Sequence, residues 1–144
     1  MTVSVILKSK GAEVISVKPD SALSSVVETL SSRRIGAVLV LHSDGKVAGV
    51  LSERDVVRAL AQHGAAALDM AASTFMTAEV VSAGSHDSIG LVMEKMTHGR
   101  FRHLPIIDEG RLVGIISIGD VVKKRIDDAE HEAQALRDYV TQAG

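Results

Sequence analysis

Two short segments of the sequence place a glycine, a serine and an aspartate at a spacing that could bind a small anionic ligand. They are Gly114-Ile-Ile-Ser117-Ile-Gly-Asp120 and Gly49-Val-Leu-Ser52-Glu-Arg-Asp55, each a strand-like run followed by a predicted helix. A helix start exposes unpaired N–H groups and a partial positive charge, which suits a phosphate. The serine hydroxyl adds a donor, Gly119 leaves the backbone accessible, and the carboxylate can accept both hydroxyls of a ribose diol.

The same spacing also has a purely structural interpretation. A serine followed three residues later by an aspartate resembles a helix N-cap, which contributes only stability. The occurrence of two copies at equivalent positions adds weight to ligand binding. Both interpretations stay open at this point.

The two segments belong to an internal duplication. The glycine-to-aspartate segment recurs after 65 residues, whereas Val14-Ile-Ser16 recurs as Val80-Val-Ser82 after 66. The one-residue difference falls between the predicted turns at 42–45 and 108–110, where an insertion is tolerated most easily. The chain therefore contains two copies of one unit.

Each copy predicts the same order of elements, β-α-β-β-α, and therefore a mixed α/β (α+β) protein. In the first copy the helix carries Leu23, Val26, Val27 and Leu30 at helical spacing, with Asp20 or Ser21 as its cap. The following helix is expected to place Val56, Val57 and Leu60 on one face. The predicted elements of copy one are strand 13–17, a helix from about 23, strands 37–41 and 47–51, and helix 52–63. Those of copy two are strand 80–82, helix 87–98, strands 103–107 and 112–116, and a last helix.

The last helix is longer than its counterpart in the first copy. Its apolar residues, Ile126, Ala129, Ala133, Leu136 and Val140, continue to the C-terminus among charges. Such a stripe could pack on its own domain, but we favour packing on a second subunit because each half is too small to bury it. The predicted organisation is repeat one with an N-terminal segment (1–64), a linker holding a turn of helix near 65–72 (65–78), repeat two (79–125) and a helical extension (126–144).

Composition excludes several classes of function. Sixteen basic and eighteen acidic residues give a net charge of −2, and aromatic residues make up only 2%, which argues against nucleic-acid binding. The chain has no cysteine, so disulfides and thiolate sites are excluded. Neither an export signal nor a membrane-spanning stretch is recognisable, and we expect a cytoplasmic protein that does not bind membranes.

No catalytic or metal-binding constellation is recognisable in the sequence. The six histidines have no metal-ligand spacing, and only His103, next to Arg102, is placed to reach a ligand. No serine lies in a Gly-x-Ser-x-Gly motif. Asp55 and Asp120 belong to separate copies, so paired acid–base catalysis is not supported.

With these motifs in place, the chain resembles a tandem pair of CBS domains, often called a Bateman module. The resemblance rests on the two glycine-to-aspartate segments, on Arg102-His-Leu-Pro105 and on Phe75-Met-Thr77, and it covers about residues 9–124. It is strongest to stand-alone bacterial CBS-pair proteins. It implies two pseudo-twofold-related repeats packed through their sheets, adenosine ligands bound in clefts between the repeats, and a homodimer.

For the first cleft, the resemblance implies that Asp120 holds the ribose hydroxyls. Ser117 and the backbone at Ile118 and Gly119 would face the ribose and phosphate, with Arg102 directed toward the phosphate, His103 able to reach a phosphate or carboxylate, and Lys10 near the cleft entrance. The residues implied for the adenine pocket are apolar or small: Val14, Ile15, Ile35, Gly36 and Ile115.

For the second cleft, the resemblance implies that Asp55 and Ser52 repeat these roles, with Val80, Val81 and Phe101 near the base. Arg54 stands in the place of Gly119, and Arg102 in the place of Gly36. Either arginine could block this cleft or bind a second phosphate, as a dinucleotide would offer.

The expected function is a non-catalytic sensor of energy or redox state that needs no metal. AMP is the first choice of ligand, with ATP, ADP and NAD(H) as alternatives, and the regulated partner would be a separate effector protein. A ligand-independent interaction or dimerisation scaffold is the main rival, and a nucleotide hydrolase is a further one that lacks a visible base.

Overall fold

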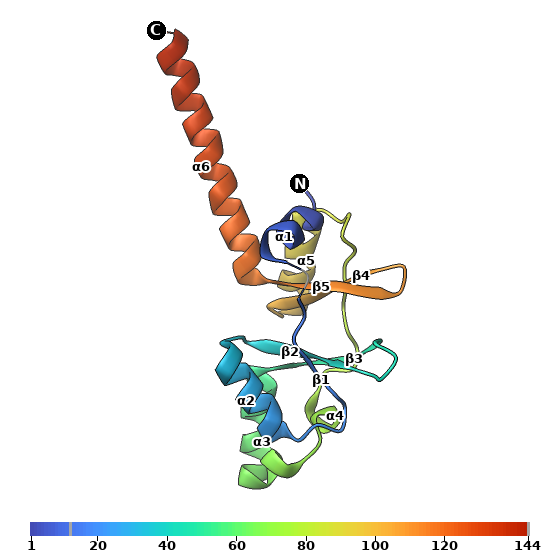
Figure 1. The fold of residues 1–144 in the computed structure, drawn as a ribbon. Coiled ribbons are helices and arrows are strands. Elements are labelled where there is room, and N and C mark those ends of the chain that lie inside the picture. The colour runs from blue at the N-terminus through green and yellow to red at the C-terminus, as the bar shows by residue number, and fades with distance from the viewer. Residues whose placement is uncertain (12, 144) are drawn as a thin grey trace.

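The structure, a computed structural model, describes residues 1–11 and 13–143. Two halves lie one above the other, each a small sheet with its helices on the outer side (Figure 1). This confirms the α/β class and the two-repeat organisation. The first half comprises β1 (Ser16–Val17), α2 (Leu23–Arg33), β2 (Ala37–Leu41), β3 (Val47–Ser52) and α3 (Glu53–His63), and the second comprises α5 (Ile89–Gly99), β4 (His103–Asp108), β5 (Arg111–Ser117) and α6 (Ile118–Ala143).

The segment between the halves contains two short helical turns, η1 (Gly64–Asp69) and α4 (Ala72–Phe75). The backbone of this segment also accepts a hydrogen bond from the start of α2, in place of the predicted side-chain cap. The N–H of Leu23 donates to the carbonyl of Met70 at 2.9 Å, and α2 has no side-chain cap. The Ser21 hydroxyl instead accepts from the N–H of Lys18, so the expectation of a cap at Asp20 or Ser21 was wrong.

The sheets differ in one strand. In the first half β1 pairs in parallel with β2, and β2 pairs antiparallel with β3. In the second half β4 and β5 form the equivalent hairpin, but the predicted strand at 80–82 is absent and only a parallel bridge joins Ala83 to Ile106. The chain turns immediately after this bridge because Asp108 accepts from both the N–H and the hydroxyl of Ser85. The turn ends the pairing at Ala83, so only the single bridge remains of the predicted strand.

Each half has its own hydrophobic core beneath its helices. Leu23, Val38 and Leu51 are fully buried in the first core, and Leu104, Ile106 and Ile116 in the second. The predicted face of α3 is only partly correct. Val56 and Ala59 are buried there, whereas Val57 is 65% exposed and Leu60 is 39% exposed.

Leu39 is fully buried, although its neighbours Val38 and Val40 already fill the first core. Side chains alternate between the two faces of a strand, so Leu39 points to the opposite face. That face is directed toward the strands of the second half (Figure 1). Leu39 therefore belongs to the junction between the repeats.

A helix that the sequence analysis did not predict, α1 (Val3–Lys10), precedes the first repeat but packs on the second. Its buried residues Val3 and Ile6 belong to the second core, and Leu7 packs against Gly114 of β5. A Cβ atom on Gly114 would lie 2.6 Å from Leu7 Cδ2, so this glycine permits the close approach of α1. The predicted domain boundaries stay a prediction.

Helix α6 leaves the body of the molecule as a single long rod (Figure 1). It has 26 residues, and every position from 129 to 142 is exposed. Across residues 1–11 and 13–143, no helix has both the length and the apolar character needed to cross a bilayer.

Candidate functional site

Both Ser–Asp pairs form reciprocal caps at the start of a helix. In the first repeat the N–H of Asp55 donates to Ser52 Oγ at 3.3 Å, and Asp55 Oδ2 accepts from the N–H of Ser52 at 2.9 Å. In the second repeat Asp120 and Ser117 make the same two bonds at 3.1 and 2.8 Å. Helix capping is therefore one role of these residues. Capping does not exclude ligand binding, because in each repeat the serine N–H donates to Oδ2 of the aspartate and the cap does not use Oδ1.

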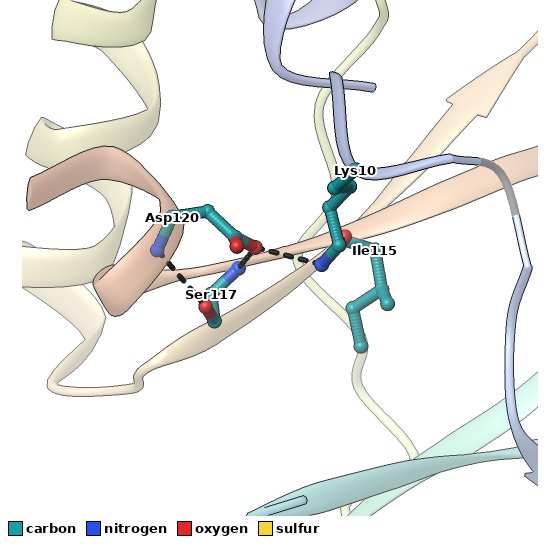
Figure 2. Close-up of polar contacts among 4 residues, drawn as sticks. All are labelled: Lys10, Ile115, Ser117 and Asp120. Atoms are coloured by element: carbon teal, nitrogen blue, oxygen red, sulfur yellow. Dashed lines mark hydrogen bonds and ion pairs between the residues drawn. The ribbon is translucent and has the colours of Figure 1, made fainter. Parts of the chain in front are cut away.

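The two caps differ in one cation. Lys10, at the C-terminal end of α1, donates from Nζ to Asp120 Oδ2 at 2.7 Å and to the carbonyl of Ile115 at 2.9 Å (Figure 2). A lysine ammonium group has three donors, so one remains for a further acceptor. In the repeat alignment Lys10 corresponds to Met76, which instead packs against Gly49. The cation therefore distinguishes Asp120 from Asp55.

The pKa of the Asp120 carboxyl reflects this environment. Burial alone would raise its pKa, but the hydrogen bonds from Lys10 and from the Ser117 N–H outweigh burial and hold the pKa below its usual value. The side chain is still 23% exposed and that of Lys10 is 33% exposed. Asp120 is thus a charged acceptor within reach of solvent, and a dissolved ligand could approach it.

Three residues from both repeats meet beside this ion pair. The imidazole of His103 lies over Gly36, where an added Cβ would be 3.2 Å from His103 Cε1 and 3.9 Å from the carboxyl carbon of Glu53. His103 also experiences the charges of Lys10, Asp120, Glu53 and Arg102. We call Lys10, Gly36, Glu53, His103, Ile115, Ser117 and Asp120 the inter-repeat cluster. It spans the junction of the two halves.

Burial, followed by the charge of Lys10, lowers the pKa of His103, and the carboxylates of Asp120 and Glu53 only partly oppose this. The unfolded chain therefore takes up a proton first as the pH falls. The stabilising contribution of neutral His103 is full above its ordinary pKa of about 6.5 and is lost toward the lower pKa of the fold. We expect the melting temperature to fall more steeply between pH 8 and pH 5 in the native protein than in His103→Gln. If the melting temperatures of the two proteins changed equally with pH across this range, the lowered pKa of His103 would be contradicted.

The backbone donors at the two helix starts are partly used within the protein. The N–H of Ile118 donates to the carbonyl of Arg102 at 2.8 Å, and the N–H of Glu53 donates to the carbonyl of Gly36 at 3.0 Å. Ile118 therefore contributes to holding the repeat together rather than offering its N–H to a ligand. Gly119 is exposed, and an added Cβ there would have only Ser117 Oγ nearby, at 3.6 Å. This position stays accessible.

The apolar residues predicted for the adenine pocket are divided between the two halves. Ile15 and Ile35 pack against the first core, and Val14 is half-buried. Ile115 is half-buried on β5 and joins the cluster through its carbonyl. Arg102 is exposed immediately before β4, next to His103 in the sequence.

The site predicted around Asp55 is less complete. Arg54 is exposed and Val80 half-buried, and Val81 is exposed on the chain that leads into the second half. Phe101 packs against the second core and closely over Gly99. Among the described residues, no cation pairs with Asp55. The structure thus brings together the predicted residues around Asp120 far better than those around Asp55.

Glu53 is a cluster residue to which the sequence analysis assigned no role. The available signal was its position immediately after Ser52, where the second copy has Ile118. This difference between the copies places an acidic side chain from the first repeat near His103 of the second, close enough for its charge to act on the imidazole.

Two hollows of the surface lie away from the cluster. One of about 650 Å³ runs along α5 and is lined by Leu91, Met93 and Glu94, among others. Another of about 240 Å³ lies between Met1, the start of α5 and Arg125 of α6. Among the described residues, no group of three or more acidic or histidine side chains is arranged to hold a metal ion.

Comparison with known proteins is consistent with this architecture. The CBS domain model matches residues 9–62 and 72–127. The structure of a CBS-domain containing protein from Agrobacterium tumefaciens is 46% identical, with a TM-score of 0.85 over 87% of this chain and 99% of that one. A protein with CBS domains from Burkholderia ambifaria is 34% identical, with a TM-score of 0.84 over 89% and 96% of the two chains. A CBS domain protein from Pyrobaculum aerophilum, complexed with AMP, is 27% identical, with a TM-score of 0.75 over 83% and 89%.

Proposed function

The chain belongs to the CBS-domain family, and from that premise we propose that its inter-repeat cluster binds an adenosine nucleotide and regulates a partner protein. The observation that carries the proposal is the Lys10–Asp120 pair beside the junction of the repeats. A negatively charged acceptor for ribose hydroxyls and a cation for phosphate lie next to each other there. Binding of AMP by the Pyrobaculum aerophilum relative supports adenine as the base.

AMP is our first choice among the possible nucleotides because the charges of the cluster and of the neighbouring Arg102 balance. Lys10 and Arg102 supply two positive charges, Asp120 and Glu53 supply two negative ones, and the lowered pKa of His103 keeps it neutral near pH 7. A triphosphate would bring more negative charge than this arrangement can neutralise. ATP, ADP and NAD(H) are the alternatives, and the thermal-shift panel described below distinguishes them from AMP.

The proposed mechanism is a shift between arrangements of the two repeats. Gly36 and Glu53 come from the first repeat, whereas His103, Ser117 and Asp120 come from the second. A ligand that contacts both sets favours one relative orientation of the repeats. A partner protein that prefers this orientation then responds to the nucleotide concentration. We propose that the protein acts in the cytoplasm, associates with itself, and performs no catalysis.

The test is a thermal-shift panel of AMP, ADP, ATP, NAD⁺, NADH and S-adenosylmethionine, with GMP and ribose 5-phosphate as controls. A ligand at a hundred times its dissociation constant stabilises the fold by about 2.7 kcal/mol, which raises the melting temperature by several degrees. Selective stabilisation by an adenine nucleotide is expected. A flat response would favour the rival scaffold function, in which the caps serve stability alone. In parallel, AMP and ATP incubated with protein and Mg²⁺ are expected to stay intact.

Replacing Lys10 with methionine gives the position the residue found at its counterpart, Met76. We expect the affinity for AMP to fall by about tenfold, because a charge-assisted hydrogen bond to phosphate is lost. The affinity for adenosine, which has no phosphate, is expected to change much less. Isothermal titration calorimetry on both ligands measures the difference, and Lys8→Met on the same helix is the matched control. Equal losses for AMP and adenosine would show that Lys10 does not contact the phosphate.

A further inference from the structure

Helix α6 carries an unpartnered apolar stripe with a regular seven-residue period. Val122, Ile126, Ala129, Ala133, Leu136 and Val140 follow one another at alternating steps of four and three residues. This 3.5-residue average is the period of a left-handed coiled coil. Ile126 is 52% exposed, Leu136 64% and Val140 63%, so the stripe lies open along most of the helix.

The stripe points away from the body of the molecule. Val121, which is almost fully buried, faces the second core, and Lys124 and Asp128 form a half-buried ion pair at 3.0 Å. These three residues occupy the side of α6 opposite the stripe in the seven-residue repeat. A second helix could therefore lie along the stripe without displacing the body, particularly over 129–142, where every position is exposed. The outer part of α6 stands clear of the rest of the molecule (Figure 1).

The charges beside the stripe select one kind of partner and one direction. The flanking positions are basic at Lys123 and Arg125, acidic at Glu130 and Glu132, and basic again at Arg137. In a parallel pair of identical helices in register, Arg125 lies opposite the partner's Glu130 and Glu132 opposite the partner's Arg137. Every such pair is attractive, and the twofold symmetry doubles their number.

An antiparallel pairing of the same helices is unfavourable. Centred between Ala129 and Ala133, it keeps the apolar stripes in contact but brings Glu130 next to the partner's Glu130. It also brings Lys123 next to the partner's Arg137, so like charges meet at both places. The charge pattern thus discriminates between the two directions.

We propose that α6 pairs with α6 of a second copy in a parallel, in-register, two-stranded coiled coil. The inference specifies the surface of the self-association proposed above, but it does not depend on nucleotide binding. A flat thermal-shift panel would therefore leave it intact, and its own failure would leave the nucleotide site untouched. Arg137, now bonded to Gln134 at 2.8 Å, is exposed and free to turn toward the partner.

The first experiment compares the native protein with Leu136→Asp by sedimentation equilibrium. The native chain is expected to be a dimer at about 10 µM. The variant should raise the dimer dissociation constant by at least about a hundredfold, because each dimer loses two buried leucines. Leu136 is exposed in the single chain, so an unchanged melting profile at low concentration serves as the control for folding. A monomeric native protein, or a dimer indifferent to this change, would overturn the proposal.

The second experiment tests direction and register, using the absence of cysteine from the sequence. Under mild oxidation Ala133→Cys should form a disulfide-linked dimer, because equivalent stripe positions face each other across a parallel pair at distances a disulfide can span. His131→Cys, on the opposite side of the helix, is the matched control and should stay unlinked. Equal linking of both variants, or no linking of Ala133→Cys, would contradict a parallel in-register pair.

A charge exchange provides an independent measurement. Glu132→Arg alone should weaken the dimer by about tenfold, because it places like charges opposite each other twice. Adding Arg137→Glu in the same chain should restore the affinity, since the pairs become attractive again. A double variant as weak as the single one would show that these positions do not face each other.

Discussion

Asp120→Ala is expected to lower the affinity for AMP by at least about a hundredfold. The carboxylate would accept both ribose hydroxyls, and a hydrogen bond to a charged group contributes about 1.5–3 kcal/mol, so two such bonds account for this loss. The Asp120 side chain is already held by the Ser117 N–H and by Lys10. Its Oδ1 atom has no hydrogen-bond partner among the described residues and is available to a ligand. Calorimetric titration with AMP measures the change.

The chain supplies its own matched control for this experiment. Asp55→Ala removes the equivalent cap in the first repeat and costs a similar amount of stability, about 1 kcal/mol. It does not touch Lys10 or His103. If the inter-repeat cluster is the binding site, Asp55→Ala should keep most of the AMP affinity. Equal loss in both variants would point to a general effect on folding, and retained affinity in Asp120→Ala would remove this residue from the site.

Leu39→Ala is expected to lower the free energy of unfolding by about 3 kcal/mol. The side chain is fully buried, and replacing a buried leucine with alanine costs about 2–5 kcal/mol because the cavity closes only partly. Leu60→Ala, at a site that is 39% exposed, should cost about 1 kcal/mol or less. Urea denaturation of both variants measures the difference. A loss no greater for Leu39 than for Leu60 would show that the junction of the repeats is not tightly packed.

Leu39 also connects stability with the proposed regulation. Because it lies at the junction rather than in the first core, its loss loosens the contact that a bridging nucleotide would strengthen. The stabilisation by AMP should then be retained in Leu39→Ala, since the polar residues of the cluster are unchanged. Thermal shifts of the variant with and without AMP measure this.

The repeat itself was predictable because its signal is local. Each Gly-to-Asp segment lies within seven residues, and the hairpins and helices around it follow from alternation and helical spacing. Helix capping could be proposed from the sequence because the serine and the aspartate of each cap are only three residues apart. The absence of the strand at 80–82 was not predictable, because its pairing depends on the strand around Ile106, more than twenty residues away, and only Ala83 forms a bridge to it.

The cation of the site lay beyond a local analysis. Lys10 was assigned to the cleft of Asp120 only through the family resemblance, because the two residues are 110 positions apart and local spacing does not relate them. Helix α1 could have been predicted, since Val3, Ile6 and Leu7 recur at helical spacing. Its packing on the second repeat could not, because a helix that precedes the first repeat in the sequence is expected to pack on that repeat. Glu53 was overlooked because its role depends on His103, a residue of the other repeat.

The placement of α1 has a consequence for synthesis on the ribosome. Residues of β5 and α6 that cover Val3 and Ile6 leave the ribosome more than a hundred residues after α1. At roughly 5–20 residues per second, the first helix waits for roughly 5–20 seconds with its apolar side uncovered. The first repeat can collapse during that interval, whereas the second completes only when the chain nears its end. A nascent chain halted before β5 should therefore be cleaved by protease near its N-terminus while its first repeat already resists.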